Sequence, residues 1–167
     1  KFCALDWKGN IYIFNCDLQQ RPLISSLPIP AYDVVCGYSN ISGKFYAIAV
    51  SVSGQAYGFD GLNNGLHHFS PIPQLAKVHI KRVYDHSNHL AFLTDKGQIW
   101  TYGSGNNGQC GNGTNEGNPT FKLIKCNENV VFSDAELGEN HSIFITQDRE
   151  TFSCGDNNNC KKGKNIR

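Results

Sequence analysis

The stretch AFLTDKGQIWTYGSGNNGQCG, residues 91–111, decides the fold class of this chain. Two short runs of β-branched and aromatic residues flank Asp95-Lys96-Gly97, and a loop rich in glycine and asparagine follows them. Because glycine reaches the positive φ that a tight reversal requires, this arrangement predicts a β-hairpin. The pattern occurs three more times along the chain, so the prediction concerns a repeat rather than a single hairpin.

The other copies share the turn and the strand that follows it. In the second copy, Gly54 takes the place of Gly97, and Asn63-Asn64-Gly65 takes the place of Asn106-Asn107-Gly108. Gly9 marks a first copy that lacks its beginning, and Arg149 marks a fourth copy that has lost the turn glycine. These turn positions are 45, 43 and 52 residues apart, a period typical of propeller blades. We therefore predict an all-β chain that forms a partial β-propeller, an arc of about three to four antiparallel blades.

The predicted domain organisation is a single repeat domain over residues 1–167, with repeats at 1–30, 31–73, 74–119 and 120–167. Prolines mark the register, in Pro28-Ile29-Pro30, Pro71-Ile72-Pro73 and Asn118-Pro119. Proline cannot donate to a β-ladder, so we expect these sites to begin the outer strand of a blade. Lys1 aligns with the middle of a blade and the chain contains no methionine, which favours a fragment of a larger propeller.

Composition narrows the function classes. Hydrophobic residues make up 40% of the chain and charged residues 17%, as in ordinary globular proteins, and no sustained helical periodicity occurs. A net charge of +1 argues against nucleic acid or an anionic membrane as partner. The basic residues at 161–167 are expected to form a solvated tail, with an acidic partner as the alternative. No apolar run long enough for a transmembrane helix occurs, and we expect an intracellular protein, cytoplasmic or nuclear.

The seven cysteines form no CxxC pair and their number is odd. This favours buried thiols in a reducing compartment, with disulfides as one alternative and a zinc site of Cys154, Cys160 and a histidine as another. His89 and His141 occupy the same repeat position, at the start of a strand. We expect them to satisfy backbone groups of the preceding turn, with metal binding or a catalytic base as the alternative. No metal or cofactor is predicted.

Two motifs give the chain a family resemblance. Residues 103–114, GSGNNGQCGNGT, resemble the G-x-N-x-x-G-Q-L-G-x-G motif of the regulator of chromosome condensation repeat, with Cys110 in place of leucine. Gly138-x-x-His141-Ser142-x-x-x-x-Thr146, followed by Gly155-x-Asn157-x-x-Cys160, resembles the same repeat. The resemblance implies a seven-bladed ring when complete, with the remaining blades in the same chain or in another one.

The resemblance also implies a protein-interaction role. The family's uses include guanine nucleotide exchange on a small GTPase of the Ran kind, docking for a ubiquitin ligase or kinase, and scaffolding. The meander of a blade places the turns near residues 86–89 and 138–141 on the same face as the loop at 106–111. We expect exposed turn residues there to contact a protein partner, and these are His86, Asn88, Glu139 and Asn140.

The alternative function is a propeller hydrolase or lyase with its active site in the channel. Such an enzyme needs paired carboxylates, and the candidates are Asp33, Asp85, Asp134 and Glu136. They do not recur in pairs at one repeat position, and no nucleophile, phosphate-binding or zinc-protease motif is present. We therefore predict no catalytic residue.

Overall fold

The computed structural model describes residues 2–14, 21–25, 27–39, 44–60, 68–86, 88–126, 129–156 and 164–165. Within these ranges the regular secondary structure is β-strand, apart from one short 3-10 helix, η1 (Pro73–Leu75). No helix in the described ranges is long and apolar enough to cross a membrane. Several sequence features lie outside these ranges: Cys16, Asn63-Asn64-Gly65, Asn157, Cys160 and the basic residues at 161–163 and 167.

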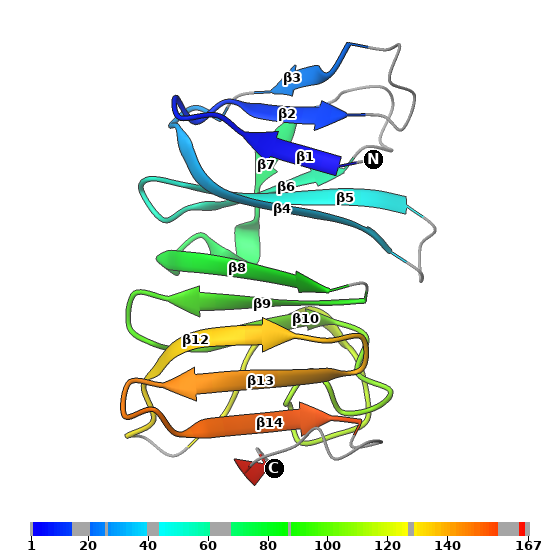
Figure 1. The fold of residues 1–167 in the computed structure, drawn as a ribbon, viewed down its shortest axis with the longest axis vertical. Helices are drawn as coiled ribbons and strands as arrows, with labels where there is room; N and C mark the ends of the chain where they lie inside the picture. Colours follow the sequence, from blue (N-terminus) through cyan, green and yellow to red (C-terminus); the bar gives the residue numbers. More distant parts are fainter. Residues whose placement is uncertain are drawn as a thin grey trace. The chain divides into compact units, whose positions relative to one another are not determined.

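The strands form four sheets that follow one another along the chain (Figure 1). The first contains β1 (Phe2–Leu5), β2 (Ile11–Phe14) and β3 (Leu23–Ser25). The second contains β4 (Ala31–Ser39), β5 (Lys44–Ser51), β6 (Ala56–Asp60) and β7 (Phe69–Pro71). The third contains β8 (Ile80–His86), β9 (His89–Thr94), β10 (Ile99–Gly103) and β11 (Asn118–Leu123). The fourth contains β12 (Phe132–Leu137), β13 (His141–Thr146), β14 (Thr151–Gly155) and β15 (Lys164–Asn165).

This architecture confirms the all-β, partial-propeller prediction, with one blade per sheet. The described registers are antiparallel, except that the two-residue strand β15 pairs parallel with β14. Strand β11 runs past residue 119, so the outer strand of the third sheet extends beyond the third predicted repeat. The chain divides into two compact units, Lys1–Val83 and Tyr84–Arg167.

The hairpin turn recurs with the same hydrogen bonds in all four sheets. The residue that opens the turn accepts a bond through its side-chain oxygen from the backbone N–H four residues later, at 2.8 to 3.2 Å. These opening residues are Asp6, Ser51, Thr94 and Thr146. The repeat alignment of the four turns is therefore confirmed at atomic detail.

The fourth position of each turn has a left-handed backbone. The φ angles are 84° at Gly9, 76° at Gly54 and 70° at Gly97. Arg149 adopts the same conformation, with a φ of 64°, although it has a side chain. Tertiary structure thus imposes the turn on the copy that lost its glycine, because the strands on both sides are already paired.

The turn also joins each sheet to the next. The carbonyl of Gly9 accepts from the N–H of Ala31 at 3.3 Å, and that of Gly54 accepts from Ile80 at 2.8 Å. In the second unit, Gly97 accepts from Phe132 at 2.8 Å. Each donor opens the first strand of the following sheet, so one turn closes a hairpin and positions the next blade.

The prolines do not all lie where the sequence suggested. Asn118-Pro119 begins the outer strand β11, as predicted. By contrast, Pro71 ends the outer strand β7, Pro73 starts η1, and residues 28–30 precede the first strand of the second sheet. Pro71 forms the last pair of its ladder, with Tyr57, and the other prolines lie in the crossings between sheets, where no ladder bond is lost.

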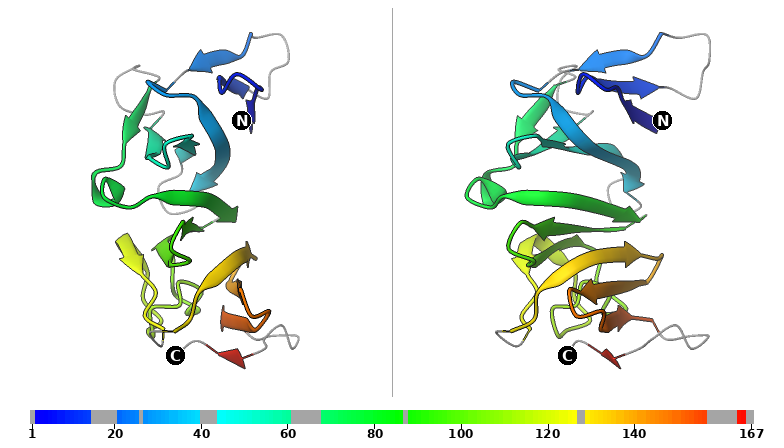
Figure 2. Two further views of the ribbon diagram at one scale, coloured as in Figure 1. Left: turned by 90° about the vertical axis from the view of Figure 1, so that its left-hand side faces the viewer. Right: turned by 60° about the vertical axis from the view of Figure 1, so that its left-hand side comes forward.

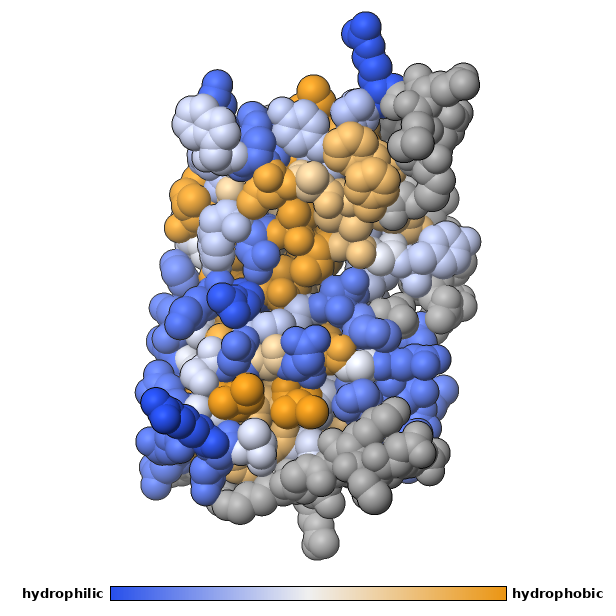
Figure 3. All heavy atoms as spheres, in the orientation of Figure 1, coloured by the Kyte–Doolittle hydropathy of each residue, from blue (hydrophilic) through white to orange (hydrophobic). Residues whose placement is uncertain are grey.

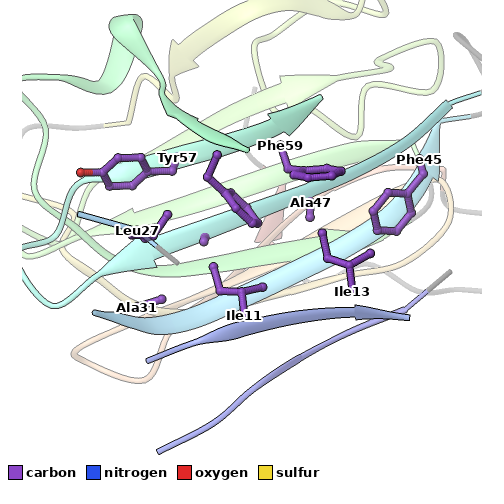
Figure 4. Packing of buried hydrophobic residues seen from close by; sticks show 10 residues of the cluster. Ile11, Ile13, Leu27, Ala31, Phe45, Ala47, Tyr57 and Phe59 are labelled. Carbon is purple, nitrogen blue, oxygen red and sulfur yellow. The ribbon is translucent and has the colours of Figure 1, made fainter. Parts of the chain in front are cut away.

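In the first unit, the core lies between the first two sheets (Figure 4). Ile11 and Ile13 of β2 point toward the residues of β5 and β6, among which Ala47, Tyr57 and Phe59 are buried. Strand β4 has a register shift near its start, between Ala31 and Asp33, and curves along its length (Figure 2). Hydrophobic residues also reach the surface over these two sheets, on the side in view in Figure 3.

In the second unit, the core joins the third and fourth sheets in the same way. Its buried members come from both sheets and from the segment between them: Ala91, Leu93, Ile99, Ile124, Phe132, Ala135, Leu137, Phe144 and Cys154. The rings of Phe132 and Phe144 meet at 5.7 Å between centroids. Both units are thus stabilised by burial of apolar surface between adjacent blades.

Candidate functional site

The four predicted contact residues lie on the two turns that open β9 and β13. His86 ends β8 and Asn88 follows in the turn, while Glu139 and Asn140 connect β12 to β13. Glu139 is exposed, and the other three are half-buried. The structure therefore exposes one of these side chains and holds the others partly within the turns.

The two turns have equivalent backbones. The carbonyl of Asn88 accepts from Ser104 at 2.8 Å, and that of Asn140 accepts from Asp156 at 2.7 Å. The facing residues, Gly103 and Gly155, have φ angles of 116° and 103°. A Cβ at Gly103 or Gly155 would collide with the Asn88 or Asn140 carbonyl, so both glycines are required by close approach.

His89 lies behind this turn face as part of a buried polar chain. Its Nε2 lies 2.8 Å from Ser142 Oγ, and the Ser142 hydroxyl donates to the Gln109 carbonyl at 2.8 Å. With the Ser142 proton used in this way, His89 Nε2–H is the donor to Ser142. The chain links β9, the 103–118 loop and β13 within the second unit.

The chain of bonds corrects the expectation for this histidine. His89 bonds a hydroxyl on the neighbouring blade, not the backbone of its own turn, because its ring points into the contact between the sheets. Its Nδ1 is buried without a hydrogen-bond partner. Burial, together with His86 and His141 nearby, lowers the pKa of His89 to about 4. His89 is therefore neutral near pH 7.

The loop between β10 and β11 is held by its own side chains. Asn112 donates to Asn118 at 2.8 Å, Asn118 donates to Thr101 at 2.9 Å, and Thr101 donates to the Cys110 carbonyl at 2.8 Å. All but Asn112 are buried. The polar residues of the loop thus mainly maintain its shape, and Asn106 and Asn107 are exposed at its tip.

The cysteine side chains also have structural roles. Cys154 is buried and donates to the Gln109 carbonyl at 3.3 Å, while burial raises the pKa of the Cys110 and Cys126 thiols. Among the described residues, no three histidine, cysteine or carboxylate side chains are grouped to hold a metal ion. Cys160, the other cysteine of the zinc alternative, lies outside the described ranges.

Two of the candidate carboxylates accept hydrogen bonds that position neighbouring strands. Asp33 accepts from the backbone of Val83 at 3.1 Å in the first unit. In the second unit, Asp134 accepts from the Tyr84 hydroxyl at 2.6 Å and from the backbone of Ala135 at 3.0 Å. These bonds are of the kind that fix the inner strands of adjacent blades.

Sequence reasoning missed the link through Ser142 and Gln109. Both residues were visible within the family motifs, but their partnership joins positions 33 residues apart. The motifs did contain a signal for this link. Ser142 directly follows the recurring histidine, and Gln109 lies in a glycine-rich loop, so both are polar residues at otherwise buried positions. Their pairing follows only from blade packing.

Comparison with known proteins agrees with this architecture. Residues 96–145 match the family model for the regulator of chromosome condensation (RCC1) repeat. The human E3 ubiquitin-protein ligase HERC2 is 28% identical over 144 residues, which cover 81% of this chain and 3% of HERC2. The guanine nucleotide exchange factor SRM1 of Saccharomyces cerevisiae is 31% identical over 81 residues, covering 46% of this chain and 17% of SRM1.

The fold is shared with solved propellers. The crystal structure of Prp20p from Saccharomyces cerevisiae superposes with a TM-score of 0.69 at 20% identity, covering 92% of this chain and 41% of that one. This chain thus spans less than half of each protein compared. The RCC1 match runs from the turn of the third hairpin through most of β13, and the same turn geometry recurs in every sheet. The chain therefore contains an RCC1 repeat at residues 96–145, and its sheets share the propeller-blade fold of Prp20p.

Proposed function

We propose that this chain is part of a protein-binding propeller, that its partner contacts the turn face, and that the partner is a small GTPase undergoing guanine nucleotide exchange. The turn face is defined by the turns at residues 86–89 and 138–141 and the loop tip at Asn106 and Asn107. The observation that carries the proposal is that the two turns of this face have equivalent backbones but different side chains. Equivalent positions hold Asn88 and Asn140, but the residues before them differ.

The opposite end of the second unit connects one blade to the next. There the carbonyl of Gly97 bonds Phe132, and Gly97 itself is buried. On the turn face, Glu139, Asn106 and Asn107 are exposed. His86 Nδ1 and Asn88 Oδ1 are buried atoms without a hydrogen-bond partner, so a partner that reaches these half-buried side chains would gain bonds the free protein lacks.

The choice of partner class is supported by two relatives. SRM1 is named a guanine nucleotide exchange factor, and the Prp20p structure is described with its binding properties to Gsp1p and histones. A propeller face that wedges against the GTPase needs no cofactor and no catalytic side chain. The turn face offers polar contacts of this kind and a single exposed carboxylate, Glu139.

The test is an exchange assay with the full-length protein and a panel of small GTPases preloaded with fluorescent nucleotide. We expect faster nucleotide release from at least one of them. Glu139→Lys should reduce the acceleration at least about tenfold, because it reverses a charge at the contact. The matched control is Asp148→Lys, which makes the same charge change at an exposed turn on the other end of β13.

Two results would count against this function. If no GTPase responds, the exchange role is lost. If Glu139→Lys and Asp148→Lys reduce exchange equally, the loss reflects overall charge, and the turn face is not the binding surface.

A further inference from the structure

Three asparagines of this chain are followed directly by glycine. These pairs are Asn64-Gly65, Asn107-Gly108 and Asn112-Gly113, and the structure describes the last two. Because glycine has no Cβ, its backbone nitrogen approaches the side-chain amide carbon of the preceding asparagine with little steric hindrance. Attack of that nitrogen on that carbon is the first step of asparagine deamidation. Each pair is therefore a candidate site for this modification, and the surrounding contacts decide which one reacts.

The Asn112 side chain is held away from this reaction by four hydrogen bonds. Its Nδ2 donates to the Glu116 carbonyl at 3.0 Å and to Asn118 Oδ1 at 2.8 Å. Its Oδ1 accepts from the backbone N–H and from the hydroxyl of Thr114, each at 3.0 Å. Loss of the Asn112 nitrogen as ammonia would also leave the buried Asn118 without this donor, which is costly.

Asn107 lies at the tip of the same loop and is held differently. Its side chain is exposed, and no hydrogen bond joins that side chain to another residue in the part of the chain that the structure describes. Its backbone N–H donates to Gln109 Oε1 at 3.0 Å, which leaves the side-chain amide able to rotate. The amide carbon of Asn107 is thus accessible to the nitrogen of Gly108.

The loop tip can open while the base of the loop stays in place. The Gly108 N–H donates to the Gly105 carbonyl at 2.7 Å, and this bond has to open before the nitrogen attacks. The base is anchored separately, because Thr101 donates to the Cys110 carbonyl at 2.8 Å and accepts from Asn118 at 2.9 Å. Opening of a surface turn costs far less than global unfolding, so the nitrogen becomes available in the folded protein.

We propose that Asn107 is a site of spontaneous deamidation in the folded protein. The Gly108 nitrogen attacks Asn107 Cγ and forms a new N–C bond, and the Cγ–Nδ2 bond breaks. The proton of the Gly108 N–H passes to the departing amide, which leaves as ammonia. Water then opens the resulting succinimide at either of its carbonyl groups and gives aspartate or isoaspartate. Both products carry a carboxylate in place of the neutral amide.

The product changes the charge of the turn face, and this consequence rests on the proposed function. Glu139 supplies an exposed carboxylate to that face, and Asn107 lies at its loop tip. A carboxylate at residue 107 adds a second negative charge, and isoaspartate also lengthens the backbone between residues 107 and 108. A partner that recognises the charge of Glu139 would therefore bind the deamidated protein differently.

The experiment is peptide mapping of the full-length protein after incubation at mildly alkaline pH, both folded and unfolded in urea. Trypsin cleaves after Lys96 and Lys122, so a single peptide contains Asn107 and Asn112. Its fragment ions assign the mass change from amide to acid to one residue or the other, and electron-transfer fragmentation separates isoaspartate from aspartate.

Two variants complete the design. Asn107→Gln removes the site, because the longer side chain closes a ring much more slowly. Thr114→Ala, at an exposed position, removes the hydroxyl bond to Asn112 and loosens that side chain.

In the folded protein, Asn107 should lose its amide at least about tenfold faster than Asn112, because the bonds of Asn112 have to open first. In urea the two rates should become similar, since both asparagines precede glycine. Thr114→Ala should accelerate the reaction at Asn112 and leave the rate at Asn107 unchanged. Asn107→Gln should abolish the mass change at residue 107.

Equal rates at Asn107 and Asn112 in the folded protein would overturn the proposal, because the loop contacts would then not select the site. An Asn107 that keeps its amide in the folded protein but loses it in urea would overturn it as well. The readout is a mass and requires no GTPase. A failed exchange assay would therefore remove the proposed function without affecting this site, and an unmodified Asn107 would leave the proposed function standing.

Discussion

His89 is a neutral histidine built into the contact between two blades. It is 1% exposed, and its Nε2 is committed to Ser142. Protonation would put a positive charge and an unpaired Nδ1–H into this buried place. The same residue on an exposed turn would have been a candidate base, so its burial rather than its identity determines its role.

The burial of His89 predicts acid sensitivity. Its pKa is about 4 in the folded chain against an ordinary 6.5, so the unfolded chain binds the extra proton between these values. The free energy of unfolding should therefore rise with pH from about 4 to 6.5, by up to about 3 kcal/mol from this group. Urea unfolding across this window measures it. His89→Gln keeps a donor for Ser142 and should show a shallower slope, and equal slopes would contradict the assignment.

Arg149 carries backbone strain that its three equivalents avoid. A left-handed conformation costs a residue with a side chain about 1–2 kcal/mol, and glycine gives back part of this through the flexibility of its unfolded state. Arg149→Gly should therefore stabilise the chain by about 0.5–1 kcal/mol in urea unfolding. Asp148→Gly, at the preceding exposed residue, is the control and should not stabilise. A destabilised Arg149→Gly would show that the arginine side chain contributes more than its backbone costs.

The hairpin turn is the element that couples one blade to the next. A Cβ at Gly97 would collide with the side chain of Val131 and lie 2.9 Å from the Phe132 carbonyl. Those residues begin the fourth sheet, so the turn cannot change without moving that sheet. The glycine is thus required both by its φ and by the close approach of β12.

Gly97→Ala should destabilise the chain by more than about 2 kcal/mol, because it adds a collision to the left-handed strain. Gly108→Ala is the matched control: Gly108 has a φ of 79°, but the nearest contact of its added Cβ would be the Asn115 side chain, at 3.2 Å. It should lose about 1 kcal/mol from strain alone. Similar losses in urea unfolding for both variants would show that the contact with β12 is unimportant.

The strands within a hairpin were the most predictable elements. His89 and His141 open β9 and β13, as their repeat position predicted, because alternation and turn glycines are local signals. The strand edges next to prolines were predicted less well, and two proline sites lie between sheets rather than at the start of an outer strand. The parallel strand β15 had no signal in the sequence pattern.

At the scale of the molecule, repetition builds the fold. Each described blade contact uses an aliphatic face against the opposite face of the following sheet. The candidate functional site was predictable from the sequence only in part. Glu139 could be placed on an exposed turn from the sequence, whereas the partial burial of His86, Asn88 and Asn140 depends on the strands around them.

The sequence by itself determined the all-β class, the four turns and the RCC1 repeat, since these rest on local backbone preferences repeated at a fixed period. Tertiary structure decided which polar residues became structural. His89, Ser142 and Gln109 meet only when two blades pack, and Arg149 adopts a glycine conformation only because its neighbours are already paired. Contacts between residues distant in the chain depend on packing, which a local pattern does not encode.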